Sequence, residues 1–348
     1  MSGAGRQPPG AAEPGFVASA TQVSEVGLDA AVQPWIGPQG QAMERLELHL
    51  TYHCPERCQF CSEDARMSRY KGFPVTWGRV AATLRAHAAR GVRAVHLTGG
   101  EPTIHPRFIE VLQLAKKLGM RTSVGTIGTM LCRPDFAAAA LPFLDEALFS
   151  VHGPDAETHD AVAGRPGSFE RVTEALRLAR RLKPGFGLFS NTVLCQPNIE
   201  RAPDTAGMLD GMGVQLMVIS NTTPEGAAFG AYERLAVPLE VLARVLPQVA
   251  ERVKGAAVRF FGVPMCLLGR HAALSNDLHW DPRVTVEWQS SQSAVHFAGI
   301  YSWAPDRRRQ HVAACGGCAR KGLCMGVYDR YVELWPTDAL QPMGEPSA

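Results

Sequence analysis

The sequence predicts an α/β fold, a partial, TIM-like (β/α)6 barrel with a small, irregular, cysteine-bearing C-terminal extension. Two observations predict it. From about residue 44, strand-like and helix-like segments alternate six times, and beyond Val258 this rhythm stops. Such alternation is typical of a parallel sheet with right-handed crossovers, and six units are too few for the complete eight-stranded barrel. In folds of this class the functional site gathers at the carboxyl ends of the strands.

The strand-like segments alternate apolar and polar residues or are short apolar runs, and the helix-like segments repeat apolar residues every three or four positions. Thr76 is a suitable N-cap for the first helix, Gly91 follows its end, and Pro106 suits the first turn of the second helix. The expected strands are 45–51, 93–97, 121–126, 147–151, 187–194 and 214–219. The expected helices are 76–90, 106–118, 133–141, 169–182, 201–212 and 239–253.

Composition divides the chain into three parts. Residues 1–40 are rich in Gly, Ala, Pro and Gln without clean periodicity, so we expect a disordered N-terminal tail. We expect the barrel over residues 44–262 and the extension over residues 263–348, where Trp, His, Pro and Arg become frequent. With 46% hydrophobic and 20% charged residues, a packed core is expected. The net charge of +2 does not indicate a nucleic-acid or anionic-membrane partner.

The chain is expected to be cytoplasmic. Its first residues lack the apolar core of a secretory signal, and no apolar run is long enough to span a bilayer. The nine cysteines are therefore expected in a reducing compartment, where clustered cysteines indicate metal binding rather than disulfides.

The first cysteine cluster directly follows the first expected strand. Cys54, Cys58 and Cys61 fall within eight residues, and three thiolates can hold three corners of a 4Fe–4S cluster while the fourth iron stays open. A zinc knuckle is the alternative, but structural zinc needs four ligands, and His53 could serve only by bending sharply. Spacing alone does not separate the two, whereas the position at the end of the first strand favours the cluster. Phe60 can offer an apolar face to a bound base.

The pattern Cys-x-x-x-Cys-x-aromatic-Cys after a first strand resembles the signature of the radical S-adenosylmethionine (SAM) superfamily. Gly99-Gly100-Glu101-Pro102, after the second expected strand, fits the same family, and the resemblance covers about residues 44–262. It implies that Cys54, Cys58 and Cys61 ligate a 4Fe–4S cluster whose fourth iron is chelated by the methionine amino and carboxylate groups of SAM. It also implies that the Gly99–Glu101 edge holds the amino group and that Phe60 packs near adenine.

Weaker matches follow along the chain. Ser150, at the end of the fourth strand, and Asn191, on the fifth, resemble ribose contacts of the family, although either could simply cap a strand end. The third strand ends in Thr-Ile-Gly over residues 126–128, where relatives have Thr-Asn-Gly, so that asparagine contact is missing. The loop 221–226, which contains a proline and a glycine, could border SAM. Other polar residues that could face the substrate are His152, His159, Asp160, Arg259, His271 and Glu287.

The second cysteine cluster lies in the expected extension. Cys315, Cys318 and Cys324 have spacings of two and five, and Cys266 is the expected fourth ligand. Four thiolates would saturate a second 4Fe–4S cluster, but a structural zinc site has the same spacing. This region resembles the SPASM/twitch extensions of radical SAM enzymes, which favours an auxiliary cluster. A full SPASM domain has seven cysteines and two clusters. Because no cysteine follows Cys324, one cluster is expected.

The resemblance implies an enzyme that reductively cleaves SAM to a 5′-deoxyadenosyl radical, which then abstracts a hydrogen from the substrate. We expect oxidative modification of a peptide or a small molecule, with a flavodoxin- or ferredoxin-type electron donor. Modification of an RNA base or nucleoside is an alternative, against which the near-neutral charge and 7% aromatic content count. A non-catalytic iron–sulfur or zinc protein is another, and the intact Gly99–Thr103 motif argues against it because a sensor needs no SAM pocket.

Overall fold

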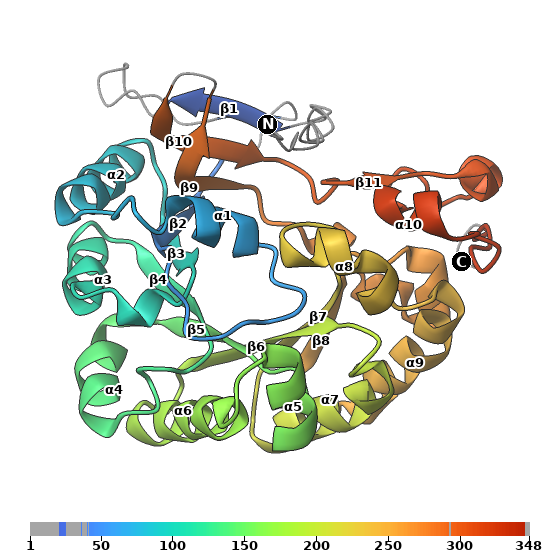
Figure 1. Ribbon diagram of the computed structural model, residues 1–348, viewed down its shortest axis with the longest axis horizontal. Helices are drawn as coiled ribbons and strands as arrows, with labels where there is room; N and C mark the ends of the chain where they lie inside the picture. Colours follow the sequence, from blue (N-terminus) through green and yellow to red (C-terminus); the bar gives the residue numbers. More distant parts are fainter. Residues whose placement is uncertain (1–20, 26–35, 37–39, 41, 292–293, 345–348) are drawn as a thin grey trace, which may run out of the picture.

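The computed structural model describes residues 21–25, 36, 40, 42–291 and 294–344. One curved sheet dominates it (Figure 1). Its strands are β1 (Thr21–Glu25), β2 (Arg45–Thr51), β3 (Ala94–Gly99), β4 (Arg121–Thr126), β5 (Glu146–Ser150), β6 (Gly187–Leu194), β7 (Leu216–Asn221), β8 (Ala257–Phe261), β9 (Arg283–Ser290) and β10 (Val295–Ser302). A small two-stranded sheet pairs β11 (Arg309–Gln310) with β12 (Val327–Tyr328).

The order of strands in the large sheet is β1-β10-β9-β2-β3-β4-β5-β6-β7-β8. Strands β2 to β8 run parallel in chain order, and β9 adds to the free side of β2, also in parallel. Strand β10 then pairs with β9, and β1 with β10, both antiparallel. The carboxyl ends of eight parallel strands therefore lie at one edge of an open, barrel-like sheet.

Helices cover the convex side of this sheet, with α2, α3, α4, α6, α7 and α9 following one another around it in Figure 1. The α-helices are α1 (Asp64–Tyr70), α2 (Trp77–Ala89), α3 (Phe108–Lys117), α4 (Pro134–Ala140), α5 (Ala156–Ala163), α6 (Ser168–Leu182), α7 (Ala202–Gly211), α8 (Ala227–Leu235), α9 (Leu239–Arg252) and α10 (Asp329–Leu334). Short 3-10 turns are η1 (Pro102–Ile104), η2 (Leu141–Phe143), η3 (Ile199–Arg201), η4 (Met265–Leu274), η5 (Asn276–His279) and η6 (Ala313–Gly317). None of the helices in the described part of the chain is long and apolar enough to cross a membrane.

Strand β2 shows why the inner face of the sheet is the functional face. Leu46, Leu48 and Leu50 point outward and are completely buried in the main core, which the covering helices share. Burial of each such leucine stabilises the fold by roughly 1.5–3 kcal/mol. Because side chains alternate along a strand, Glu47 and His49 point to the opposite, inner face. The inner face therefore carries polar side chains that do not contribute to the hydrophobic core and are available for a functional site.

The expected α/β partial barrel is confirmed, and the six expected strands and six expected helices are present with ends displaced by two residues or fewer. Helices α1, α5 and α8 and strand β8 are additional elements. Strands β9 and β10 lie in the segment expected to be irregular, and they continue the barrel sheet. The expectation of a disordered tail over residues 1–40 is wrong for Thr21–Glu25, which form β1 because β10 offers a free edge. Most of the remaining tail lies outside the described residues.

Candidate functional site

The loop between β2 and α1 carries the first three cysteines, and all three are half-buried. Burial raises the pKa of Cys54 to about 12 and that of Cys61 to about 11. Burial, followed by the nearby Glu56 carboxylate, raises the pKa of Cys58 well above its usual range. An isolated thiolate is therefore unfavourable at each position, and a bound metal centre would stabilise the anionic form.

The glycine turn after β3 braces the start of this loop. The Gly100 amide donates to the Thr51 carbonyl at 2.7 Å, and the Glu101 amide donates to the His53 carbonyl at 2.8 Å. A Cβ atom on Gly100 would overlap the His53 carbonyl oxygen and lie 2.7 Å from its carbon. Gly99 has φ +108°, which favours glycine. The two motifs recognised in the sequence thus interlock through their backbones.

Two further segments brace the remainder of the loop. The Arg57 amide donates to the Ala163 carbonyl at 3.0 Å at the end of α5. The Ala227 amide at the start of α8 donates to the Cys61 carbonyl at 2.9 Å, and a side chain on the preceding Gly226 would overlap that carbonyl. The loop 221–226, expected to border SAM, therefore ends against the third cysteine. No sequence motif indicates this backbone contact.

One compact group of candidate metal ligands lies beside the first cysteine loop. Among the described residues, the group of three or more His, Cys, Asp and Glu whose candidate ligand atoms all lie within 4.8 Å of one another is His49, Glu63 and Glu287. Neither cysteine set forms such a group. The three thiols of the first set suit a 4Fe–4S cluster with one open iron, whereas structural zinc is bound by four ligands.

The Glu101 carboxylate is buried and held by several hydrogen bonds within the protein. Its side chain is 1% exposed, and burial raises its pKa. The carboxylate accepts hydrogen bonds from the hydroxyl and amide of Thr103, from Thr126 Oγ1 at 2.7 Å and from the Ile127 amide at 2.9 Å. Pro102, also buried, begins η1 beside it. The end of β4, where the sequence departs from the family pattern, thus anchors Glu101 and the glycine turn.

Phe60 points toward the end of β5. Its ring contacts His152 edge-on, with centroids 4.7 Å apart, and it packs beside buried Val162 and Cys195. Burial, together with the neighbouring His159, holds the pKa of His152 well below its usual range, so that ring is neutral. Phe60 therefore lies in an apolar corner, an environment that would suit a purine base.

Ser150 and Asn191 are brought together by the sheet. They are directly opposite one another in the β5–β6 register, on the inner face. The Asn191 carbonyl oxygen accepts a hydrogen bond from Ser220 Oγ of β7 at 2.7 Å, which fixes the orientation of the amide. Both residues are half-buried, so their polar groups face the interior of the open barrel. This position would allow the ligand contacts expected of them.

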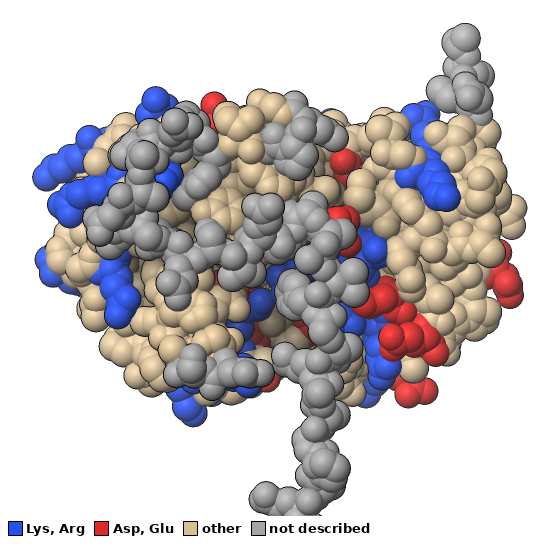
Figure 2. Space-filling view, turned by 90° about the horizontal axis from the view of Figure 1, so that it is seen from above, with Lys and Arg blue, Asp and Glu red and all other residues tan. Residues whose placement is uncertain are grey.

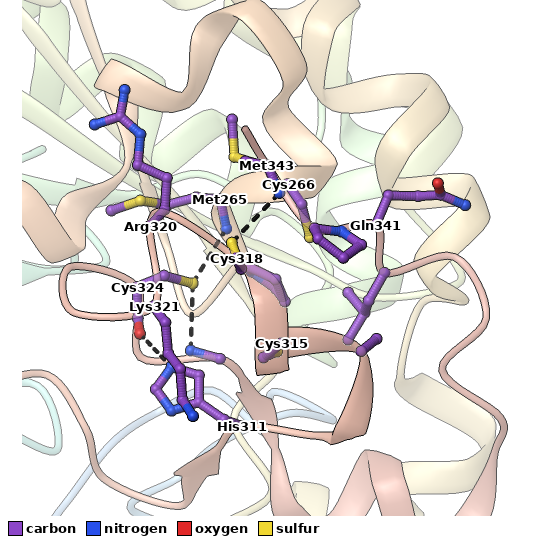
Figure 3. A pocket seen from close by; sticks show the side chains of 15 residues that line it. Met265, Cys266, His311, Cys315, Cys318, Arg320, Lys321, Cys324, Gln341 and Met343 are labelled. Carbon is purple, nitrogen blue, oxygen red and sulfur yellow. Dashed lines mark hydrogen bonds between the residues drawn. The ribbon is translucent and has the colours of Figure 1, made fainter. Parts of the chain in front are cut away.

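The second cysteine set converges on one pocket. Cys266 of η4 and Cys315, Cys318 and Cys324 line it together, as Figure 3 shows. The amides of Met265 and Gly326 donate to Cys324 Sγ at 3.4 and 3.3 Å. The Met343 amide donates to Cys318 Sγ at 3.4 Å.

Such amide–sulfur hydrogen bonds stabilise thiolates that carry a metal cluster and tune its potential. Burial raises the pKa of both Cys266 and Cys324. The four thiols expected from sequence spacing to act together are thus assembled in one place.

Sequence reasoning missed a buried polar chain beneath the first cluster. Cys58 Sγ donates to Glu56 Oε2 at 3.5 Å, and the other Glu56 oxygen accepts a hydrogen bond from Ser168 Oγ. Ser168 also contacts His159 Nε2 at 3.3 Å. Burial raises the pKa of Glu56, which favours its neutral form. Glu56 lies inside the cysteine motif and looks like an ordinary solvent-exposed loop residue in the sequence. Its near-complete burial is visible only in the structure.

Comparison with known proteins agrees with this geometry. Residues 48–208 match the model of the radical SAM superfamily. This segment is a radical SAM domain. Members of the superfamily use a 4Fe–4S cluster and SAM, which agrees with the cofactors expected from the cysteine loop.

Individual relatives match part of this chain. The chain is 28% identical over 222 residues to the PqqA peptide cyclase of Rhodopseudomonas palustris, covering 62% of this chain and 58% of the relative. It is 28% identical over 207 residues to the PqqA peptide cyclase of Gluconobacter oxydans, covering 59% and 57%. It thus spans less than two thirds of the length of these relatives.

Solved structures show the same fold. Streptococcus suis SuiB bound to S-adenosylmethionine superposes with a TM-score of 0.53 at 13% identity, over 86% of this chain and 76% of SuiB. At this identity the likeness concerns the fold. It covers a larger share of the chain than the matched segment 48–208.

Proposed function

We propose that this chain is a radical SAM enzyme in which Cys54, Cys58 and Cys61 hold a SAM-binding 4Fe–4S cluster. The observation that carries the proposal is the interlocking of the three-cysteine loop with the Gly99–Glu101 turn at the carboxyl ends of β2 and β3. A loop with three thiols leaves one iron of a cubane open to a further ligand. The radical SAM domain supplies the context in which that ligand is SAM.

The residues of the chain would bind and orient the cofactors. The glycine edge would receive the methionine amino group, Phe60 would pack against adenine, and Ser150 and Asn191 would contact the ribose. When bound, the cofactors supply one-electron cleavage of the sulfonium bond to the 5′ carbon, giving methionine and the 5′-deoxyadenosyl radical that takes a substrate hydrogen. The apolar corner around Phe60 and the helix-covered sheet would limit access of water and competing hydrogen donors.

The pocket of Cys266, Cys315, Cys318 and Cys324 would hold an auxiliary 4Fe–4S cluster. Four thiols fit a cluster without an open iron, and the amide donors to Cys318 and Cys324 fit thiolate ligands. A closed cluster suits transfer of an electron away from a substrate radical. Oxidative modification would follow from that transfer.

We propose a peptide as the substrate class. PqqA peptide cyclases are named for a peptide substrate, and SuiB has also been solved bound to the precursor peptide SuiA, with a TM-score of 0.50 to this chain. An RNA substrate has less support. On the parts of the face in Figure 2 not covered by grey atoms, basic side chains predominate at one end, whereas acidic and basic side chains intermingle at the other. A nucleic-acid backbone would favour a continuous basic surface.

The nine cysteines are free thiols in the structure. This supports a reducing compartment such as the cytoplasm, because disulfides form and persist in oxidising ones. A flavodoxin- or ferredoxin-type protein would supply the electron there.

Electron paramagnetic resonance of the reduced, anaerobically purified protein tests the proposal. Addition of SAM should change the signal of the first cluster, because SAM would bind its open iron. Simultaneous replacement of Cys54, Cys58 and Cys61 by alanine should abolish this response and leave the auxiliary signal. Cys132→Ala is the matched control, since Cys132 is half-buried but belongs to neither set. A wild-type signal indifferent to SAM would contradict the proposal.

Iron content tests the second site. The wild-type protein should hold about eight irons, as two four-iron clusters require. Cys266→Ser should make the auxiliary cluster labile while the SAM response of the first cluster survives. Stoichiometric zinc with about four irons would contradict the auxiliary cluster.

A further inference from the structure

Four ionisable side chains form a ring of close contacts beside the cysteine loop. His49 lies on β2, Glu63 ends the loop, Arg66 lies on α1 and Glu287 lies on β9. His49 contacts Glu63 through Nδ1 at 3.5 Å and Glu287 through Nε2 at 3.3 Å. Arg66 contacts the same two carboxylates, each at 3.0 Å. Acidic and basic groups alternate around the ring, and each contacts two others.

The ring is withdrawn from water. The Glu287 and His49 side chains are 2% and 5% exposed, and those of Glu63 and Arg66 are 22% and 19% exposed. Charges in such positions are screened little, so each depends on its partners. Removing one member leaves two neighbours short of a counter-charge.

The ring connects segments that are distant in sequence. Glu63 follows Cys61 by two residues, whereas Glu287 comes from a strand more than two hundred residues further along the chain. Strand β9 holds Glu287 in place because it pairs in register with β2. The carboxyl-terminal part of the chain thus reaches the end of the first cysteine loop through the buried Glu287 carboxylate and Arg66. Trp288 and Ser290 of β9 also hydrogen-bond to Tyr52 and Tyr70 on either side of that loop.

We infer that Glu287 and Arg66 are positioning residues for the first cluster. This inference rests on the proposed function. Arg66 holds Glu63, and Glu63 fixes the loop end that carries Cys61. Glu287 holds Arg66 in the orientation that this requires. Without Glu287, Arg66 has one carboxylate partner in the ring rather than two, and within the ring Glu63 contacts the sheet through His49 alone.

A second ion pair on the same two strands provides the matched control. Arg283 of β9 contacts Glu47 of β2 at 2.7 Å, and both side chains are buried to a similar degree. This pair lies earlier on each strand, and the other contacts of Glu47 are with Arg45 and Thr285, both outside the cysteine loop. Glu47→Gln should therefore weaken the β2–β9 contact and leave the cluster environment unchanged.

The experiment compares wild type, Glu287→Gln and Glu47→Gln as reconstituted holoenzymes. Glu287→Gln should weaken SAM binding, which is measured by the SAM-induced change in the resonance signal. It should also speed the loss of iron. Each effect should be about 10- to 100-fold, as for other residues that orient metal ligands. Glu47→Gln should match wild type in both measurements at a comparable loss of thermal stability. Equal SAM binding and iron retention in Glu287→Gln and wild type would overturn the inference.

Arg66→Lys keeps the test decisive if Glu287→Gln does not fold. Lysine retains the charge but lacks the planar fork that bridges two carboxylates. It lies on a short, partly exposed helix, and the same weakening of SAM binding is expected. A wild-type protein without any SAM response would overturn the proposed function itself, whereas a responsive wild type with an equally responsive Arg66→Lys would overturn only the positioning role.

Discussion

Arg309 and Asp277 form a two-point ion pair inside the C-terminal extension, with Nη1–Oδ1 and Nη2–Oδ2 distances of 2.6 and 2.9 Å. Their side chains are 1% and 0% exposed. Arg309 also donates to the carbonyls of Val263 and Gly326, and the Met325 amide donates to Asp277. The pair thus connects Val263, which precedes Cys266, to Met325 and Gly326, which follow Cys324, and so joins two segments that line or flank the pocket of the second cysteine set.

Asp277→Asn should therefore disrupt that pocket. A buried guanidinium without its carboxylate costs about 3–5 kcal/mol. We expect iron to fall from about eight to about four per chain, with the SAM response retained. Glu200→Gln is the control, because the Glu200–Arg244 pair is exposed and contributes little. Full iron content in Asp277→Asn would show that the pair does not organise the pocket.

Gly100→Ala should displace the first cysteine loop. The added methyl group would overlap the backbone carbonyl of His53, which precedes Cys54, and backbone cannot move aside as a flexible side chain can. SAM binding should weaken by at least about ten-fold, the effect typical of disturbing the support of a metal ligand. Isothermal titration with SAM measures it.

Gly78→Ala is the matched control for this substitution. Gly78 lies in α2 with open space around it, and alanine favours a helix by about 1 kcal/mol over glycine. Its SAM affinity should equal that of wild type. Unchanged affinity in Gly100→Ala would show that the glycine turn tolerates a side chain and does not hold the loop.

The Glu47–Arg283 pair should make stability depend on pH in acid. Burial alone would raise the pKa of Glu47, but Arg283 and Arg45 outweigh it and lower the pKa to about 2. Because the folded-state pKa lies below the unfolded one, the stabilisation is present above about pH 4.5 and is lost as pH falls toward 2.

Chemical denaturation at a series of pH values measures this effect. Glu47→Gln should lower the free energy of unfolding at pH 7 by a few kcal/mol, on the order of the pKa shift. The difference between variant and wild type should shrink between pH 4.5 and 2. A difference that stays constant across this range would exclude the carboxylate charge as its cause.

Deleting residues 263–348 should give insoluble protein. The deletion removes β9, and the edge of β2 then loses its parallel partner. An unpaired edge of an apolar strand favours aggregation. Solubility and circular dichroism of the shortened chain test this, and deletion of residues 1–20, which spares β1, is the control. A soluble, folded 1–262 fragment would show that the barrel does not need the extension's strands.

The strand–helix alternation was sufficient to predict the barrel, because each unit carries its own local periodicity. Strand β9 has an equally clear pattern, with Val284, Val286 and Trp288 buried and polar residues between them. It was missed because the surrounding composition indicated irregular structure. Its parallel partner β2 lies more than two hundred residues away, and no local pattern specifies that pairing.

The sequence predicts the parts of the candidate site in which the residue type itself, such as cysteine, indicates the chemistry. Cysteine spacing indicates both candidate ligand sets, and Cys266 lines one pocket with its expected partners. Glu287 was noted only as one polar residue among several. Its connection to His49 and Arg66 depends on the register of β9. The hydrogen bond from the Ala227 amide to the Cys61 carbonyl is a backbone contact that no side-chain motif specifies.

Formation of 5′-deoxyadenosine is the most direct test of the central claim. Reduced, reconstituted protein incubated anaerobically with SAM should release 5′-deoxyadenosine and methionine in equal amounts, measured by liquid chromatography and mass spectrometry. The variant lacking Cys54, Cys58 and Cys61 should release neither, whereas Cys132→Ala should match wild type. Absence of 5′-deoxyadenosine from wild-type protein with a full complement of iron, or its continued formation by the triple variant, would contradict the account.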